Sequence, residues 1–126
     1  TMDGQRASYE AIHRWAHRYA DGRWIAVGGG GYEWVDVVPR AWTHLIAEAA
    51  GAPIAPETPT PESFRAFVAE SMGRPGPARM TDGRHPWAKP FEQGFDPSDP
   101  VDASVAATRS AVFPWHGLEA DPDPWF

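Results

Sequence analysis

A single apolar stretch, Trp24-Ile25-Ala26-Val27, limits most strongly what this chain can fold into. It is short and does not alternate between apolar and polar residues, which is typical of a strand buried on both faces of a parallel sheet. No second stretch of this kind occurs in the 126 residues. Because a strand needs neighbours for its backbone hydrogen bonds, the chain cannot build a sheet alone. We expect the sheet to be completed by further sequence or by another subunit.

Two amphipathic helices are predicted on either side of this stretch. Apolar residues at three- and four-residue spacing predict a helix over residues 2–20, with Thr1 as N-cap and Asp21-Gly22 as its end. The same spacing predicts a helix over residues 38–50, with Asp36 as N-cap. The expected apolar faces contain Tyr9, Ile12, Trp15, Ala16 and Tyr19 in the first helix, and Val38, Trp42, Leu45, Ile46 and Ala49 in the second.

The sequence changes character after Gly51, where most of the 14 prolines lie. We interpret residues 52–61 as a linker, and periodic apolar residues predict a third helix over residues 62–72. Residues 74–100 lack periodicity, so we expect them to be mobile when the chain is alone. A short helix is predicted over residues 103–112, capped by Asp102.

Charge and composition exclude several classes of partner. The formal net charge is −6, and the 11 Lys and Arg residues are scattered, which argues against nucleic acid and against an anionic membrane surface as partners. The absence of cysteine excludes disulfides and thiolate metal sites, and it fits a cytoplasmic protein. Because the chain opens on Thr1 and enters a helix at once, we expect it to be a fragment of a longer protein.

The run Gly28-Gly29-Gly30-Gly31-Tyr32, followed by Val38-Pro39-Arg40-Ala41-Trp42-Thr43, gives the chain a recognisable pattern. With Thr1-Met2-Asp3-Gly4 ahead of it, this pattern resembles the histone-deacetylase superfamily, and within it the bacterial acetoin utilization proteins. The resemblance implies an α/β fold, the three-layer arginase/deacetylase-like fold, of which residues 1–51 are the C-terminal part of the catalytic domain. Residues 52–126 would be a Pro-rich C-terminal extension with short helices. In isolation we expect mostly helix and loop, with one buried strand near residues 24–27.

The resemblance also implies a chemistry and a set of site residues. Members of this family are expected to hydrolyse an acyl amide, here acetylated lysine in a protein or a small-molecule amide, with a water bound to zinc or another divalent metal. Tyr32 would be the catalytic tyrosine that stabilises the oxyanion. Gly29, Gly30 and Gly31 would let the backbone approach the substrate. Arg40, Trp42 and Thr43 match the family pattern, and we assign them scaffolding roles.

The metal ligands and the paired general-base histidines of such enzymes belong to segments that precede this pattern, so we expect no catalytic metal site and no cofactor in this chain. His13 and His17 have the i, i+4 spacing of a helical metal pair. No Glu lies between them as in H-E-x-x-H, and an ordinary helix surface is the interpretation that we favour. The remainder of the deacetylase domain is the expected partner.

The glycine run and the uncovered apolar surface each allow a second interpretation. Phosphate binding by the glycine run is disfavoured, because Glu33 stands where a dinucleotide-binding loop needs its third glycine and no Lys-Ser or Lys-Thr follows. A non-catalytic interaction or oligomerisation segment stays open, since a fragment with an uncovered apolar surface can form a homo-oligomer.

Overall fold

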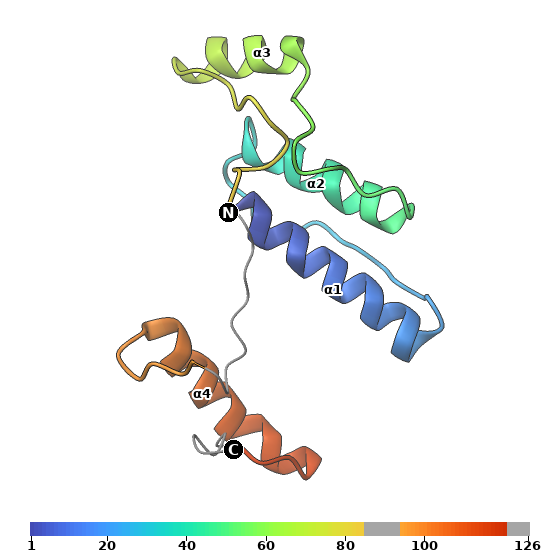
Figure 1. Ribbon diagram of the computed structural model, residues 1–126, viewed down its shortest axis with the longest axis vertical. Helices are drawn as coiled ribbons and strands as arrows, with labels where there is room; N and C mark the ends of the chain where they lie inside the picture. Colours follow the sequence, from blue (N-terminus) through green and yellow to red (C-terminus); the bar gives the residue numbers. More distant parts are fainter. Residues whose placement is uncertain (85–93, 121–126) are drawn as a thin grey trace. The chain divides into compact units, whose positions relative to one another are not determined.

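The structure of the chain is a computed structural model that describes residues 1–84 and 94–120 (Figure 1). The chain divides into two units, residues 1–86 and residues 87–126, which are considered separately below. Within the described residues the structure consists of helices and loops, as expected, and contains no β-strand.

Helix α1 (Met2–Ala20) confirms the first predicted helix at both ends. The Thr1 side chain accepts a hydrogen bond from the backbone N–H of Gly4 at 3.1 Å, which satisfies one of the free donors of the first turn. The helix ends at Asp21, which adopts a left-handed backbone with φ of 52°. In the part of the chain that the structure describes, no helix is both long enough and apolar enough to cross a membrane.

Helix α2 (Val37–Ala49) is the second predicted helix, shifted by one residue toward the N-terminus. Asp36 occupies the N-cap position, but its side chain makes no capping hydrogen bond. The physical reason is that both carboxylate oxygens bind arginines, Arg40 and Arg74. Gly51, with φ of 68°, follows the helix as predicted.

Residues 24–27 correct the prediction of a buried strand within this chain. They are extended, but they pair with no other strand in the described residues. Ile25 and Val27 are 88% and 81% exposed, and Trp24 is half-buried. Residues 25–27 are exposed because an apolar strand without a neighbouring strand has neither ladder hydrogen bonds nor a layer to cover it.

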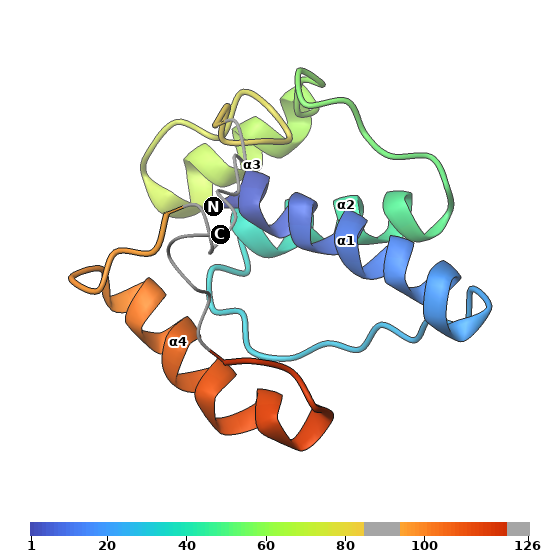
Figure 2. The ribbon, with the colours of Figure 1, turned by 60° about the horizontal axis from the view of Figure 1, so that its bottom comes forward.

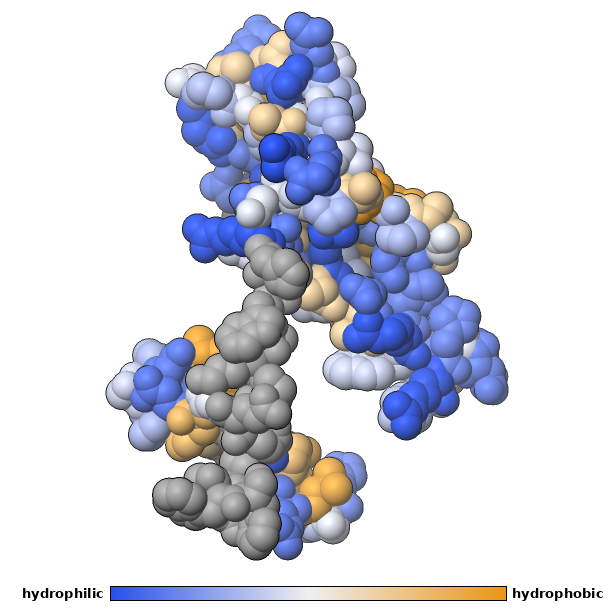
Figure 3. Space-filling view, in the orientation of Figure 1, coloured by the Kyte–Doolittle hydropathy of each residue, from blue (hydrophilic) through white to orange (hydrophobic). Residues whose placement is uncertain are grey.

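Helices α1 and α2 pack against each other, but not through the faces that the sequence predicts (Figures 1 and 2). Of the predicted apolar residues only Ala16 is buried, whereas Arg40, Ala41 and His44 form the buried side of α2. Large apolar side chains therefore remain at the surface, and Figure 3 shows some of the apolar patches on one face of the molecule. The exposed large apolar side chains of these two helices are Ile12, Trp15, Tyr19, Trp42 and Ile46.

Helix α3 (Glu62–Met72) matches the third predicted helix, and its Val68 is fully buried. After α3 the chain returns to the segment before it, where the backbone N–H of Thr60 donates to Ala78 O at 3.1 Å and that of Met80 donates to Thr58 O at 2.9 Å. Part of the stretch that we expected to be mobile, residues 74–84, is thus tied to the predicted linker. The remainder of that prediction falls partly on residues 85–93, outside the described residues.

The second unit contains α4 (Pro100–Val112) and the 3-10 helix η2 (Phe113–His116). Helix α4 begins three residues before its predicted start. Asp99, and not Asp102, is the cap: its carboxylate accepts from the Val101 N–H at 2.8 Å. Pro100 can occupy the first helical position because the backbone N–H that it lacks has no partner there. Neither helix contains a buried residue.

Candidate functional site

Tyr32 lies on the connection between α1 and α2, just before the turn that leads into α2. The carbonyl of Glu33 accepts hydrogen bonds from the N–H groups of Val37 and Val38, both at 3.0 Å. This turn fixes the end of the loop against the first turn of α2. The Tyr32 side chain is 91% exposed, so the core of this chain does not use its ring or its hydroxyl.

The glycine run lies along the exposed apolar side of α2. A Cβ at Gly31 would come within 3.1 Å of Val38 Cγ2, and a Cβ at Gly28 within 3.5 Å of the Trp42 ring. Gly31 therefore permits a close approach of loop and helix, whereas a Cβ at Gly29 would meet no atom within 4 Å. None of the four has the positive φ that Gly22 and Gly51 have.

Arg40 is the centre of a buried ionic network that links α2 to the segment after α3. Its guanidinium donates to the Asp36 carboxylate at 2.8 Å and to Asp82 Oδ1 at 3.2 Å. Arg74 donates to the other oxygen of Asp36 at 2.6 Å. The side chains of Arg40 and Asp36 are each 6% exposed, so this pair is shielded from water. The scaffolding role predicted for Arg40 corresponds to these contacts.

Trp42 and Thr43 have different surroundings from Arg40. Trp42 is exposed and lies beside Gly28, as described above. Thr43 is also exposed, and its hydroxyl donates to the carbonyl of Pro39 one turn earlier in the same helix, at 2.7 Å. Their predicted scaffolding roles stay predictions, since neither side chain joins the ionic network.

A reciprocal set of hydrogen bonds joins the start of α1 to residues 82–84. The Met2 N–H donates to the Asp82 carboxylate at 2.7 Å, while the Asp3 carboxylate accepts from the N–H groups of Asp82 and Arg84, both at 3.1 Å. Burial favours a higher pKa for Asp82, but the hydrogen bonds from Met2 and Arg40 and the positive charge of Arg40 outweigh it and lower that pKa. Asp82 is thus held as a carboxylate that serves two elements at once. We call these contacts the Asp3–Asp82 clasp.

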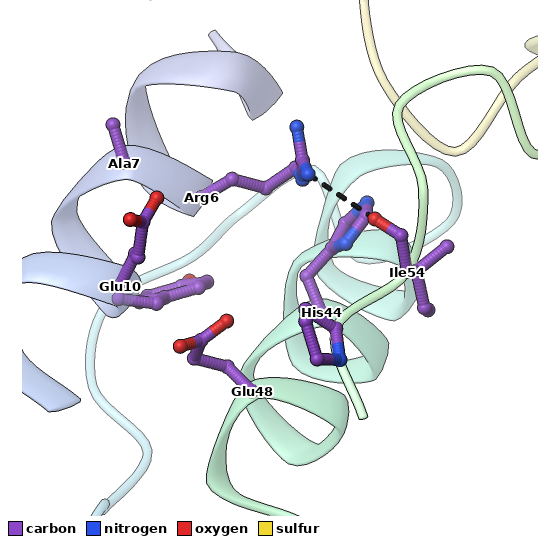
Figure 4. A pocket seen from close by; sticks show the side chains of 8 residues that line it. Arg6, Ala7, Glu10, His44, Glu48 and Ile54 are labelled. Atoms are coloured by element: carbon purple, nitrogen blue, oxygen red, sulfur yellow. Dashed lines mark hydrogen bonds between the residues drawn. The ribbon is translucent and has the colours of Figure 1, made fainter. Parts of the chain in front are cut away.

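A cavity of about 420 Å³, lined by both polar and apolar side chains, lies where α1 faces α2 and the segment that follows it (Figure 4). Arg6 reaches from α1 across it to the carbonyl of Ile54, at 3.1 Å. His44 lines the cavity and donates from Nε2 to the carbonyl of Met80 at 2.9 Å. Burial lowers the pKa of His44, which favours the neutral ring. None of the predicted site residues lines this cavity.

The structure brings together residues that the sequence did not single out. His44 carries no functional signal in the sequence, and Asp36 is predicted there only as a cap. The i, i+4 spacing of Asp36 and Arg40 was the available sign of their ion pair. The contacts of His44 and Arg40 with residues 79–82 had no such sign, because 36 to 42 residues separate the partners.

No set of three or more histidine, aspartate and glutamate side chains among the described residues can hold a metal ion. His44 is buried on α2, and His85 lies outside the described residues. His13 and His17 lie together on α1, and His116 ends η2. Among the described residues, these histidines therefore do not join a metal-binding set of three or more side chains.

Comparison with known proteins supports the resemblance inferred from the glycine run. The chain is 53% identical over 47 residues to the acetoin utilization protein AcuC of Bacillus subtilis (strain 168). No protein-family model matches the chain. No solved structure matches it either. The chain is thus similar to AcuC over 34% of its own length, and this similarity spans 12% of that protein.

Proposed function

We propose that this chain is part of a metal-dependent deacetylase that hydrolyses acetylated lysine or a related acyl amide. Its contribution is one wall of the substrate pocket, formed by Gly29, Gly30 and Gly31, and the catalytic Tyr32. The observation that carries the proposal is the 53% identity to AcuC over 47 residues, together with the Gly28–Tyr32 run. The proposal concerns the complete protein, because the matched region is a small part of AcuC.

Tyr32 is suited to stabilise a developing oxyanion. During amide hydrolysis negative charge builds on the carbonyl oxygen, and a neutral hydroxyl that donates a hydrogen bond there binds the transition state more strongly than the substrate. The exposed side chain directly precedes the turn that starts at Glu33, so its backbone is anchored on that side while its hydroxyl is available. Gly31 supports this position, because any larger residue would crowd Val38.

The uncovered apolar surface supports the remainder of the deacetylase domain as partner. Ile25 and Val27 are exposed beside the glycine run, and Trp42 and Ile46 are exposed on α2. In the complete protein we expect residues 24–27 to pair with neighbouring strands and become the buried strand that the sequence predicts. The divalent metal, zinc in the simplest case, would be held by residues of that remainder.

The test uses the full-length parent protein and an acetyl-lysine peptide. Tyr32→Phe removes one hydrogen-bond donor from the transition state and should lower kcat by about 10²–10³-fold. Since the donor acts mainly in the transition state, kcat and kcat/KM should fall together. Tyr19→Phe is the matched control, because Tyr19 is also exposed but lies at the end of α1. Its kcat should equal that of the wild type.

Three outcomes distinguish the reaction, the role of Tyr32 and the substrate class. An active parent with an impaired Tyr32→Phe variant supports both the reaction and the role of Tyr32. An active parent with an unimpaired variant keeps the reaction and removes the tyrosine from it. A parent that hydrolyses neither acetyl-lysine nor small acetyl amides, although it binds metal, contradicts the substrate class.

A second candidate function is a non-catalytic interaction or oligomerisation segment. It is favoured by the same exposed apolar residues of α2, and by α4, in which no residue is buried. Such surfaces bind other proteins or second copies of the same chain. An inert parent that elutes as a defined oligomer would favour this function over deacetylation.

A further inference from the structure

The C-terminal half of α1 carries two histidines one helical turn apart, His13 and His17. Their Nε2 atoms lie 3.0 Å from each other. On the other side of the ring, His13 Nδ1 donates to the carboxylate of Glu48 on α2 at 3.0 Å. We propose that His13 and His17 bind one divalent transition-metal ion through their Nε2 atoms, and that Glu48 orients His13 for this binding.

The separation of the two nitrogens fits neighbouring positions around one metal ion. At a metal–nitrogen distance of about 2.0–2.1 Å, two ligands at a right angle place their nitrogens about 2.9 Å apart. The two rings are inclined at 50° with their centres 4.8 Å apart, and their Nε2 atoms are close enough to share one ion. Two coordinated imidazoles can adopt this arrangement with little movement.

Glu48 decides which nitrogen of His13 is available. Because a carboxylate can only accept, Nδ1 of His13 carries the proton, and the lone pair is left on Nε2, which faces His17. A carboxylate that accepts from the non-coordinating nitrogen is the usual outer partner of a metal-bound histidine, and it raises the basicity of the ring. The side chains of His13 and Glu48 are 21% and 17% exposed, so water only partly screens this contact.

Stacking on Trp24 orients the His13 ring before any metal binds, and Gly22 leaves room for the His17 ring. Trp24 stacks on His13, with ring centres 5.5 Å apart and planes inclined by 22°. At Gly22, where φ is 75°, an added Cβ would come within 3.2 Å of the His17 ring, so glycine leaves the room that this ring occupies. A site whose ligands are already oriented loses less entropy on binding.

The ligand set selects the metal. Two imidazoles leave the other coordination positions to water, because among the described residues no third histidine, aspartate or glutamate completes the set. Imidazole suits copper, nickel and zinc, and at such an open site affinity follows the general order with Cu²⁺ above Ni²⁺ and Zn²⁺. This inference uses no residue of the glycine run and does not depend on the deacetylase proposal.

The contact between His13 and Glu48, which favours metal binding by the two histidines, joins residues that are distant in sequence. The i, i+4 spacing alone favoured an ordinary helix surface, as in many amphipathic helices. Glu48 is 35 residues from His13 and lies on another helix, so the sequence pattern could not include it.

The test is calorimetric titration of the 126-residue chain with CuCl₂, NiCl₂ and ZnCl₂ in a buffer that does not chelate metals. We expect one Cu²⁺ per chain, bound more tightly than Ni²⁺ or Zn²⁺. His17→Gln removes one ligand and should lower the Cu²⁺ affinity by at least about 10-fold, while Glu48→Gln should lower it by about 10–100-fold. His116→Gln, at the end of η2, is the matched control and should leave the affinity unchanged.

His17→Gln is the decisive variant, because His17 is exposed and its loss should leave the fold intact. A His13 variant would also lose the contacts with Glu48 and Trp24. Circular dichroism confirms that the variant is folded. A saturating metal should raise the Tm of the wild type but not of His17→Gln, since binding stabilises only the form with the site. Equal Cu²⁺ affinity in the wild type and His17→Gln would overturn the proposal, as would the absence of saturable binding of all three metals.

Discussion

Two arginines of this chain form the same kind of ion pair in opposite surroundings. Arg40 pairs with Asp36, and Arg14 pairs with Glu10, each with an acid four residues earlier in a helix. The first pair is 6% exposed on both sides, whereas the second is 65% and 61% exposed. Because burial leaves an unpaired charge without water, removing one partner matters far more in the first pair than in the second.

Arg40→Ala is therefore expected to lower the free energy of unfolding by about 3–5 kcal/mol, since it leaves Asp36 and Asp82 without their shared donor. Arg14→Ala should change it by less than about 1 kcal/mol. Urea unfolding followed by circular dichroism measures both. Because Arg74 still contacts Asp36 in this variant, we expect the loss of unfolding free energy to lie toward the lower end of the range. Equal effects of the two substitutions would mean that the Arg40 network does not stabilise the fold.

At the scale of elements, local sequence predicts the helices well and their packing poorly. The bounds of α1 and α3 agree with the sequence, because spacing and the residues at the ends, such as Thr1 and Gly73, are local properties. The buried side of α2 does not, because Arg40 and His44 find partners near residues 79–82. Burial of a polar residue depends on such distant partners, which periodicity does not contain.

The candidate site shows the same division. The position of Tyr32 at the exit of a glycine loop follows from the order of residues along the chain. The exposure of residues 25–27 does not follow from the sequence. An apolar strand pattern predicts burial only where neighbouring strands are present. The catalytic assignment of Tyr32 remains a prediction, and the experiment with the parent protein tests it.

The start of α4 provides an element-scale prediction. Asp99→Ala should reduce the stability of this helix by about 1 kcal/mol, because the Val101 N–H loses its acceptor. Asp99→Asn should preserve the helix, since asparagine caps equally well. Secondary chemical shifts of residues 100–112 in the full chain measure the helix population. If Asp102→Ala reduced it more than Asp99→Ala, the cap would be at Asp102, as the sequence alone suggested.

At the scale of the whole molecule, the uncovered side of α2 should govern association. Ile46 is 63% exposed on that side, and apolar surface of this kind favours self-association. Sedimentation velocity at increasing concentration should show growing oligomers for the wild type and less association for Ile46→Lys. Ser63→Lys adds the same charge on α3, where residue 63 is exposed, and is the matched control. A wild-type chain that stays monomeric at every concentration would contradict this expectation.

The Asp3–Asp82 clasp has a consequence for the time course of folding. Its bond from Met2 to Asp82 joins residues 80 positions apart, so it can form only after every element of the first unit has been made. At a synthesis rate of about 5–20 residues per second, Asp82 follows Met2 by about 4–16 s. Throughout that interval the Asp3 carboxylate has no backbone partner from residues 82–84. In a nascent chain the first turn of α1 therefore gains these partners only after α2 and α3 have been made.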